Sequence, residues 1–251
     1  MTMPIFVLRF SPWAATLAGF FLLEAQWQWP HAYPWPLLGA LVVVLISAVA
    51  IAWKRVPWSE LANNLCPTVL LLVALGLAAL HLESVLERQV LTGMFIVVPL
   101  FALELLFLLA FDPRRYPVNG FSRFNVALVP LCVAAAAFGL AGLVIFVQVP
   151  AWTVVLALTL LSALLLLVTS HPTASPAQRR LWTLLGGMAG LHAGICVALL
   201  PVGLGVLAAL AALMVGFVLR IRRYAYQPVP PRSLALGEGL SAGAAFLILL
   251  L

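Results

Sequence analysis

Long apolar runs alternate with short polar segments along the whole chain. Because a helix needs roughly 20 apolar residues to cross a hydrocarbon core about 30 Å thick, each run of that length predicts a transmembrane helix. The predicted ranges are 4–25, 35–53, 61–80, 94–111, 124–147, 151–169, 181–199, 203–219 and 233–251. The connections are too short for a soluble domain. The sequence therefore predicts an all-α polytopic integral membrane protein, a bundle of about nine transmembrane helices forming a single domain over residues 1–251.

Residues near the helix starts refine these boundaries. Ser175, Pro176 and Gln178 form a capping box with proline at the first helical position, so the helix over 181–199 is expected to begin before its membrane part. Ser59 and Ser233 are expected to cap two other helices in the same way.

In two segments the sequence permits more than one helix boundary. Pro12 either starts a short first helix or kinks a longer one that begins near Pro4, and we favour the longer helix because only it spans comfortably. Residues 81–89 contain neither Gly nor Pro, so the third helix is expected to continue through them and turn near Thr92 and Gly93.

Composition supports a membrane environment for the chain. Apolar residues make up 65% of it and charged residues 8%, against about 25% charged in an ordinary soluble domain. The mean hydropathy is +1.17. The three cysteines, Cys66, Cys132 and Cys196, all lie inside apolar runs and are interpreted as small buried hydrophobes rather than disulfide partners.

The positive charges predict an orientation. With the N-terminus inside, twelve of the 13 Lys and Arg residues fall on the inner side and only Arg88 on the outer side. Nine spans then place the C-terminus outside. We expect the inner Arg-rich loops, 112–123 and 220–232, to face anionic lipid headgroups, and the net charge of +6 to reflect this rather than binding of nucleic acid. The predicted location is multi-pass in a cell membrane, specifically the bacterial cytoplasmic membrane.

Two carboxylates lie within apolar runs, Glu104 and Glu238. Both are roughly 8 to 10 Å from the inner surface at 1.5 Å per residue, so they could share one polar pocket, with Asn63 and Asn64 entering at overlapping depth. An ionisable group at membrane depth is a candidate substrate or proton site. The alternative is that each carboxyl is neutral and hydrogen-bonds a neighbouring helix.

The predicted helix over 181–199 carries a packing pattern and a histidine. Gly186, Gly190 and Gly194 form a seam that permits close approach of another helix. His192 lies on roughly the opposite face and could ligate a haem or chlorophyll metal. A histidine satisfied within the bundle is favoured instead, because no second imidazole is placed at its depth. We therefore expect no cofactor and no metal site.

Other local patterns are interpreted as packing or interface features. The string Gly239 to Gly243 matches G-x-S-x-G, but a membrane helix cannot supply the strand-to-helix elbow, so we expect no catalytic residue there. The leucines 164–167 are expected to face lipid. The aromatic segment 24–35 is interpreted as an interfacial belt, with a docking surface for a partner or a lipophilic ligand as the alternative.

These features favour a non-enzymatic subunit, scaffold or assembly factor of a membrane complex, with a membrane protein as partner. The main alternative is a transporter or lipid flippase built around Glu104 and Glu238. An intramembrane enzyme or a haem protein using His192 is the third hypothesis.

Overall fold

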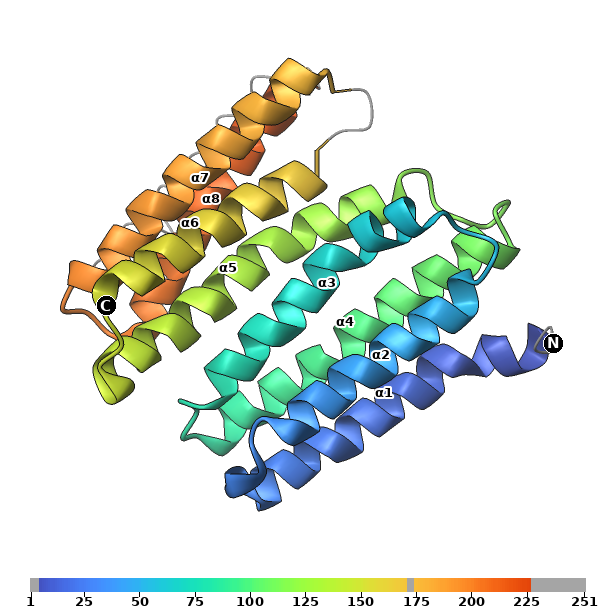
Figure 1. The fold of residues 1–251 in the computed structure, drawn as a ribbon, viewed down its shortest axis with the longest axis horizontal. Coiled ribbons are helices and arrows are strands. Elements are labelled where there is room, and N and C mark those ends of the chain that lie inside the picture. Colours follow the sequence, from blue (N-terminus) through green and yellow to red (C-terminus); the bar gives the residue numbers. More distant parts are fainter. Residues whose placement is uncertain (1–4, 171–173, 227–251) are drawn as a thin grey trace. The chain divides into compact units, whose positions relative to one another are not determined.

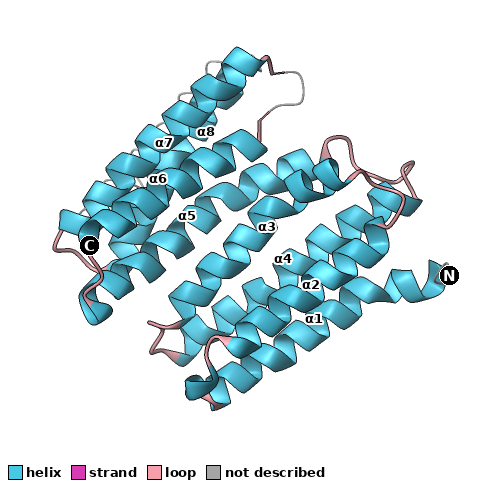
Figure 2. Ribbon diagram, in the orientation of Figure 1, coloured by secondary structure: helices cyan, strands magenta, loops and turns pink. Residues whose placement is uncertain are grey.

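The described chain is entirely helical. The computed structural model describes residues 5–170 and 174–226 and contains no strand in these ranges (Figures 1 and 2). The helices are α1 (Ile5–Gln28), α2 (Trp35–Ala52), α3 (Trp58–Ala79), α4 (Val85–Phe111), α5 (Gly120–Val147), α6 (Ala151–Val168), α7 (Pro176–Leu199) and α8 (Leu204–Tyr226), with a short 3₁₀ helix, η1 (Pro30–Ala32). All eight α-helices are long and apolar enough to cross a membrane. The predicted helix 233–251 and the predicted cap Ser233 lie outside the described residues.

The chain divides into two compact units, each described by itself. The first ends at Asn125 and the second begins at Val126, so α5 starts in the first unit and continues into the second. The predicted single domain, the count of nine spans and the orientation stay predictions.

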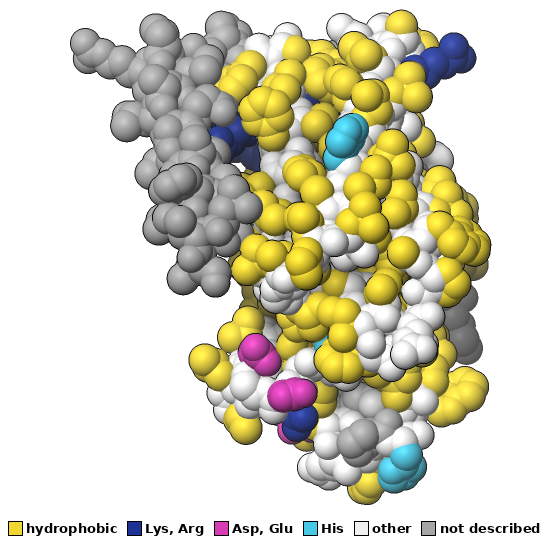
Figure 3. Space-filling view, turned by 90° about the vertical axis from the view of Figure 1, so that its left-hand side faces the viewer, with side chains coloured by type: hydrophobic (Ala, Val, Ile, Leu, Met, Phe, Trp, Pro, Cys, Tyr) yellow, Lys and Arg dark blue, Asp and Glu magenta, His cyan; other side chains and the backbone are white. Residues whose placement is uncertain are grey.

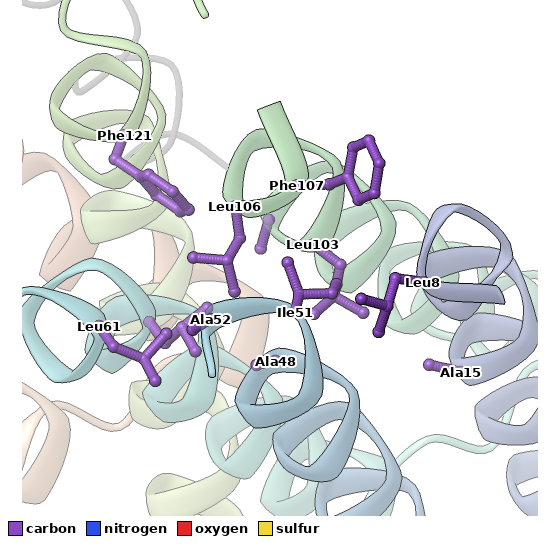
Figure 4. Close-up of a cluster of buried hydrophobic side chains, with 12 residues drawn as sticks. Leu8, Ala15, Ala48, Ile51, Ala52, Leu61, Leu103, Leu106, Phe107 and Phe121 are labelled. Atoms are coloured by element: carbon purple, nitrogen blue, oxygen red, sulfur yellow. The ribbon is translucent and has the colours of Figure 1, made fainter. Parts of the chain in front are cut away.

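In the first unit, α1 packs on α2 and α4, and α3 packs on α4. Figure 4 shows how Leu8 from α1, Ile51 from α2 and Leu103 from α4 point toward one another in the buried core. Small side chains such as Ala48 and Ala52 let the helix backbones approach, which is how helices associate where lipid offers no hydrophobic driving force.

In the second unit, α7 packs on both α6 and α8. Large apolar side chains remain exposed on many described helices, and Figure 3 shows hydrophobic side chains spread over the surface of the described residues, with few charged ones among them. Exposed apolar surface on this scale marks contact with another apolar phase. The chain is therefore a helical membrane protein in contact with a lipid bilayer.

Several predicted helix starts can be compared with the structure. Ser175 and Gln178 form the predicted capping box, and α7 begins at Pro176. α1 is the longer helix, with Pro12 inside it. The prediction for Ser59 was wrong: α3 begins one residue earlier, at Trp58, and its N-cap is Pro57, which makes no side-chain capping bond.

The prediction that the third helix continues through residues 81–89 was also wrong. α3 ends at Ala79, and α4 begins at Val85, so Thr92 and Gly93 lie inside α4. The reason is a second capping box: the Ser84 side chain accepts from the Glu87 backbone N–H, and the Glu87 carboxylate accepts from the Ser84 N–H. Those two bonds start a helix where the apolar pattern alone shows no boundary.

The leucine run 164–167 does not face lipid as a whole. Leu165 and Leu166 are fully buried, whereas Leu164 and Leu167 are exposed. Four consecutive residues cover more than a full turn, so they cannot all lie on one face of a helix that packs against a neighbour. Leu166 is buried because it lies against Gly186 of α7.

Topology can be tested with single cysteines in a background lacking Cys66, Cys132 and Cys196. Trp29 and Val118 are both exposed, so a cysteine at either position is accessible to a reagent on its own side. We expect Trp29→Cys to react with an impermeant thiol reagent in intact cells and Val118→Cys to react only after lysis. Equal labelling of both in intact cells would contradict the predicted orientation.

Candidate functional site

Glu104 forms an ion pair with Arg9 in the first unit. Nη1 of Arg9 lies 2.5 Å from Oε2 of Glu104, which joins the first turns of α1 to the last two turns of α4. The Glu104 side chain is 23% exposed and that of Arg9 is 49% exposed. Glu104 lies seven residues before the end of α4, about 10 Å along the helix. The pairing meets part of the cost of placing an ionised carboxylate at that depth.

Aromatic rings extend this cluster. The Arg9 guanidinium carbon lies 4.9 Å from the ring centroid of Phe107, which stacks on Phe111 at 4.8 Å and 13°. Arg55 lies over the other ring, 3.8 Å from the Phe111 centroid. Two guanidinium groups, two rings and one carboxylate therefore form a continuous cluster, in which cation–π contacts supplement the ion pair.

The other oxygen of Glu104 is buried and unpaired among the described residues. Oε1 is buried and accepts no hydrogen bond from the described residues. An ionised carboxylate can accept several hydrogen bonds, so this oxygen can take a proton, a cation or a donor group of a ligand. This is the chemistry that a substrate or proton site at Glu104 would use.

The described part of the structure does not place the predicted partners of Glu104, which are Glu238, Asn63 and Asn64, in one pocket with it. Glu238 lies outside the described residues, so the shared pocket stays a prediction. Asn63 is exposed, and the backbone carbonyl of Asn64 accepts a hydrogen bond from Nδ2 of Asn125 at 3.0 Å. Neither asparagine is joined to Glu104 by a hydrogen bond in this part of the chain. The sequence analysis missed Arg9, which it counted only as an inner-side charge although it falls inside the first apolar run.

The three seam glycines of α7 lie against α6. A methyl group at the Cβ position of Gly190 would lie 2.4 Å from the carbonyl oxygen of Leu158, and one on Gly194 would lie 2.6 Å from Cα of Val155. At Gly186 the nearest atom, Cγ of Leu166, would be 2.8 Å away. All three distances are shorter than a van der Waals contact, so only glycine allows the two backbones to lie this close.

His192 lies on the opposite face of α7 and is exposed. Its Nδ1 lies 2.7 Å from the backbone oxygen of Met188. A carbonyl only accepts, so Nδ1 is the donor in this contact, and Nε2 is the ring nitrogen that points away from it. His192 is seven residues before the end of α7, about 10 Å inside the span.

Arg222 is a buried residue that the sequence analysis also missed. The residue is 6% exposed, and its guanidinium donates to the backbone oxygen of Leu166 and to Oγ1 of Thr169, at 3.2 to 3.3 Å. α8 continues seven residues beyond its predicted end at 219, and this extension carries Arg222 to the carboxyl end of α6. A cation there satisfies the last helix carbonyls and complements the helix dipole.

Comparisons with known proteins assign no role to these residues. The chain matches no family model, and no curated protein or solved structure matches it. In the described ranges, no group of three or more His, Cys, Asp or Glu side chains is placed to hold a metal ion. Function must therefore be argued from the geometry alone.

We predict that Gly190→Leu prevents close packing of α7 on α6. The new side chain would have to displace the Leu158 backbone, and overpacking of this kind costs about 1–3 kcal/mol or more. The measurement is the amount of folded protein and its melting temperature in mild detergent. The matched control is Leu160→Ala on α6, because that leucine is 60% exposed. If the Gly190→Leu protein accumulates normally while the Leu160→Ala protein does not, the packing role of the glycine seam is contradicted.

Proposed function

We propose that this chain is a non-enzymatic subunit, scaffold or assembly factor of a membrane complex, and that the exposed face of α7 binds another membrane protein. The observation that carries the proposal is the exposed imidazole of His192 at membrane depth. Ionisable residues in membrane helices almost always face the bundle interior. A polar nitrogen facing hydrocarbon costs free energy that a hydrogen bond from a partner helix would recover.

The apolar residues around His192 have the spacing of a helix-docking face. The exposed side chains on this face of α7 recur at intervals of three or four residues: Leu184, Met188, Leu191, Ile195 and Leu199. This spacing aligns them in one stripe, as in helices that pack side by side. The glycine seam occupies the other face, so α7 can bind α6 and a partner helix at the same time.

Site-specific photocrosslinking tests this proposal. A photoreactive amino acid at Met188 or Ile195 is expected to give one discrete protein adduct in native membranes, and the same group at Leu160 on α6 is expected to give only lipid adducts. His192→Leu is expected to weaken the adduct about tenfold, the effect of losing about 1.4 kcal/mol of binding free energy. His192→Gln, which keeps a hydrogen-bonding group, is expected to restore part of it. Adducts of equal kind and yield at α6 and α7 would contradict docking through α7.

The visible spectrum of the native membranes distinguishes a cofactor on His192 from a protein partner. The Nδ1 bond to Met188 leaves Nε2 as the ring nitrogen that could ligate a haem or chlorophyll metal. We expect His192→Ala to leave the visible absorption spectrum unchanged. Loss of an absorption band would favour the cofactor over the protein partner.

A second candidate function is a transporter or flippase that uses Glu104. The unpaired Oε1 atom favours it, because a carboxylate with one paired oxygen and one that lacks a partner among the described residues could bind a proton or a cation.

In that case Glu104→Gln is expected to abolish the chain's contribution to growth while leaving its abundance near wild type, because the amide oxygen still accepts from Arg9 but does not titrate. Glu238→Gln is expected to do the same if both carboxyls form one site. Glu60→Gln, at the exposed start of α3, is the control. Wild-type growth and abundance of both variants would exclude the paired site.

A further inference from the structure

An apolar cavity of about 150 Å³ lies between α2, α3 and α4 of the first unit. Its walls come from the first turns of α2, the last turns of α3 and one side chain of α4. The side chains that matter here are Tyr33, Leu37, Leu38, Val73, Gly76 and Phe95. Tyr33 is the one lining residue with a polar side chain.

The cavity exists because α2 packs closely on α1 and α4 and only sparsely on α3. At one point α2 and α3 do touch: a Cβ on Gly76 would lie 3.3 Å from Cδ1 of Leu37, so the glycine leaves room for that leucine. Leu37 is buried there. The cavity is the space beside this contact that the other side chains of the two helices leave unfilled.

The cavity is partly open at the surface of the first unit. Leu38 on α2 is 45% exposed and Val73 on α3 is 48% exposed, so one apolar side chain on each helix faces outward beside the gap. The lining residues of α3 lie within seven residues of its end at Ala79, about 10 Å along the helix. An apolar pocket of this size offers no hydrogen-bond partners to water and suits an apolar group. At this depth the surrounding phase supplies hydrocarbon chains.

Tyr33 adds a polar group at the end of the cavity. Its hydroxyl makes no hydrogen bond to the described residues, and burial raises the pKa of the phenol. The group therefore stays a neutral donor, with its ring against the cavity and its O–H available. Tyrosine is enriched at the level of lipid headgroups because it combines an apolar ring with a polar tip.

We propose that this cavity is a binding site for one acyl chain of a membrane phospholipid, whose ester oxygen accepts a hydrogen bond from the Tyr33 hydroxyl. The chain would supply the dispersion contacts that an empty cavity lacks. The proposal is independent of the docking face on α7, because every residue that forms the cavity belongs to the first unit.

Photolabelling by lipid tests this site. The full chain is reconstituted into vesicles that contain a phospholipid with a photoreactive group on its acyl chain. Peptides from α2 and α3 that line the cavity are expected to label about tenfold more than the exposed α6 peptide around Leu160. Val73→Trp is expected to fill the mouth and lower the labelling about tenfold, and Leu38→Trp is expected to do the same from the other side. Tyr33→Phe is expected to lower labelling severalfold by removing only the hydroxyl.

The matched control is Val97→Trp on α4, because Val97 is 49% exposed and does not line the cavity. It should leave the labelling unchanged. If a tryptophan at Val73 prevents folding, Leu38→Trp and Tyr33→Phe still test the site. Uniform labelling of all exposed helices, or labelling unaffected by filling the mouth, would overturn the proposal. Recovery of an apolar molecule other than a phospholipid from the cavity would also overturn it.

Discussion

The close approach of α7 to α6 is the contact on which the second unit depends. In hydrocarbon, apolar side chains gain nothing by leaving lipid for protein, so helices associate only through closer packing and a few polar bonds. Gly186, Gly190 and Gly194 bring the α7 backbone against α6, and any side chain at those positions would overlap α6 atoms. Because this packing uses one face of α7, the face with His192 remains for contacts outside the unit.

Charged side chains in both units are paired with specific groups on neighbouring helices. Arg9 pairs with Glu104 and lies over Phe107, and Arg222 donates to the Leu166 carbonyl and the Thr169 hydroxyl at the end of α6. Each arrangement joins two helices and gives a charged group a partner. These contacts therefore combine a structural role with local chemistry, and the free oxygen of Glu104 is the part that packing alone does not explain.

Three features extend beyond the internal packing of the chain: the free nitrogen of His192, the free oxygen of Glu104 and the cavity beside Tyr33. Each offers a different ligand chemistry, respectively a hydrogen-bonding helix, a proton or cation, and a hydrocarbon chain. The first lies in the second unit and the other two lie in the first. A subunit that binds a partner through α7 and a lipid through the first unit would use both units without needing a catalytic group.

The sequence alone determined the features that depend on local pattern. Apolar runs locate the helices, and the capping box at Ser175 follows from residues three apart, so most described helices begin and end within a few residues of their predicted ranges. The start of α4 and the end of α8 differ more, because polar residues extend these helices beyond the apolar run. The same local chemistry is present at Ser84 and Glu87, and this capping box ends the predicted continuation of the third helix through residues 81–89.

Only the tertiary structure decided which faces are buried and which groups meet. In a helix that is apolar all round, hydropathy cannot distinguish a buried position from a lipid-facing one, and so Leu165 was assigned to the wrong environment. The pairing of Arg9 with Glu104 joins residues 95 positions apart, and the cavity at Gly76 depends on how far α2 lies from α3. These are consequences of helix packing, which no local pattern in an apolar sequence specifies.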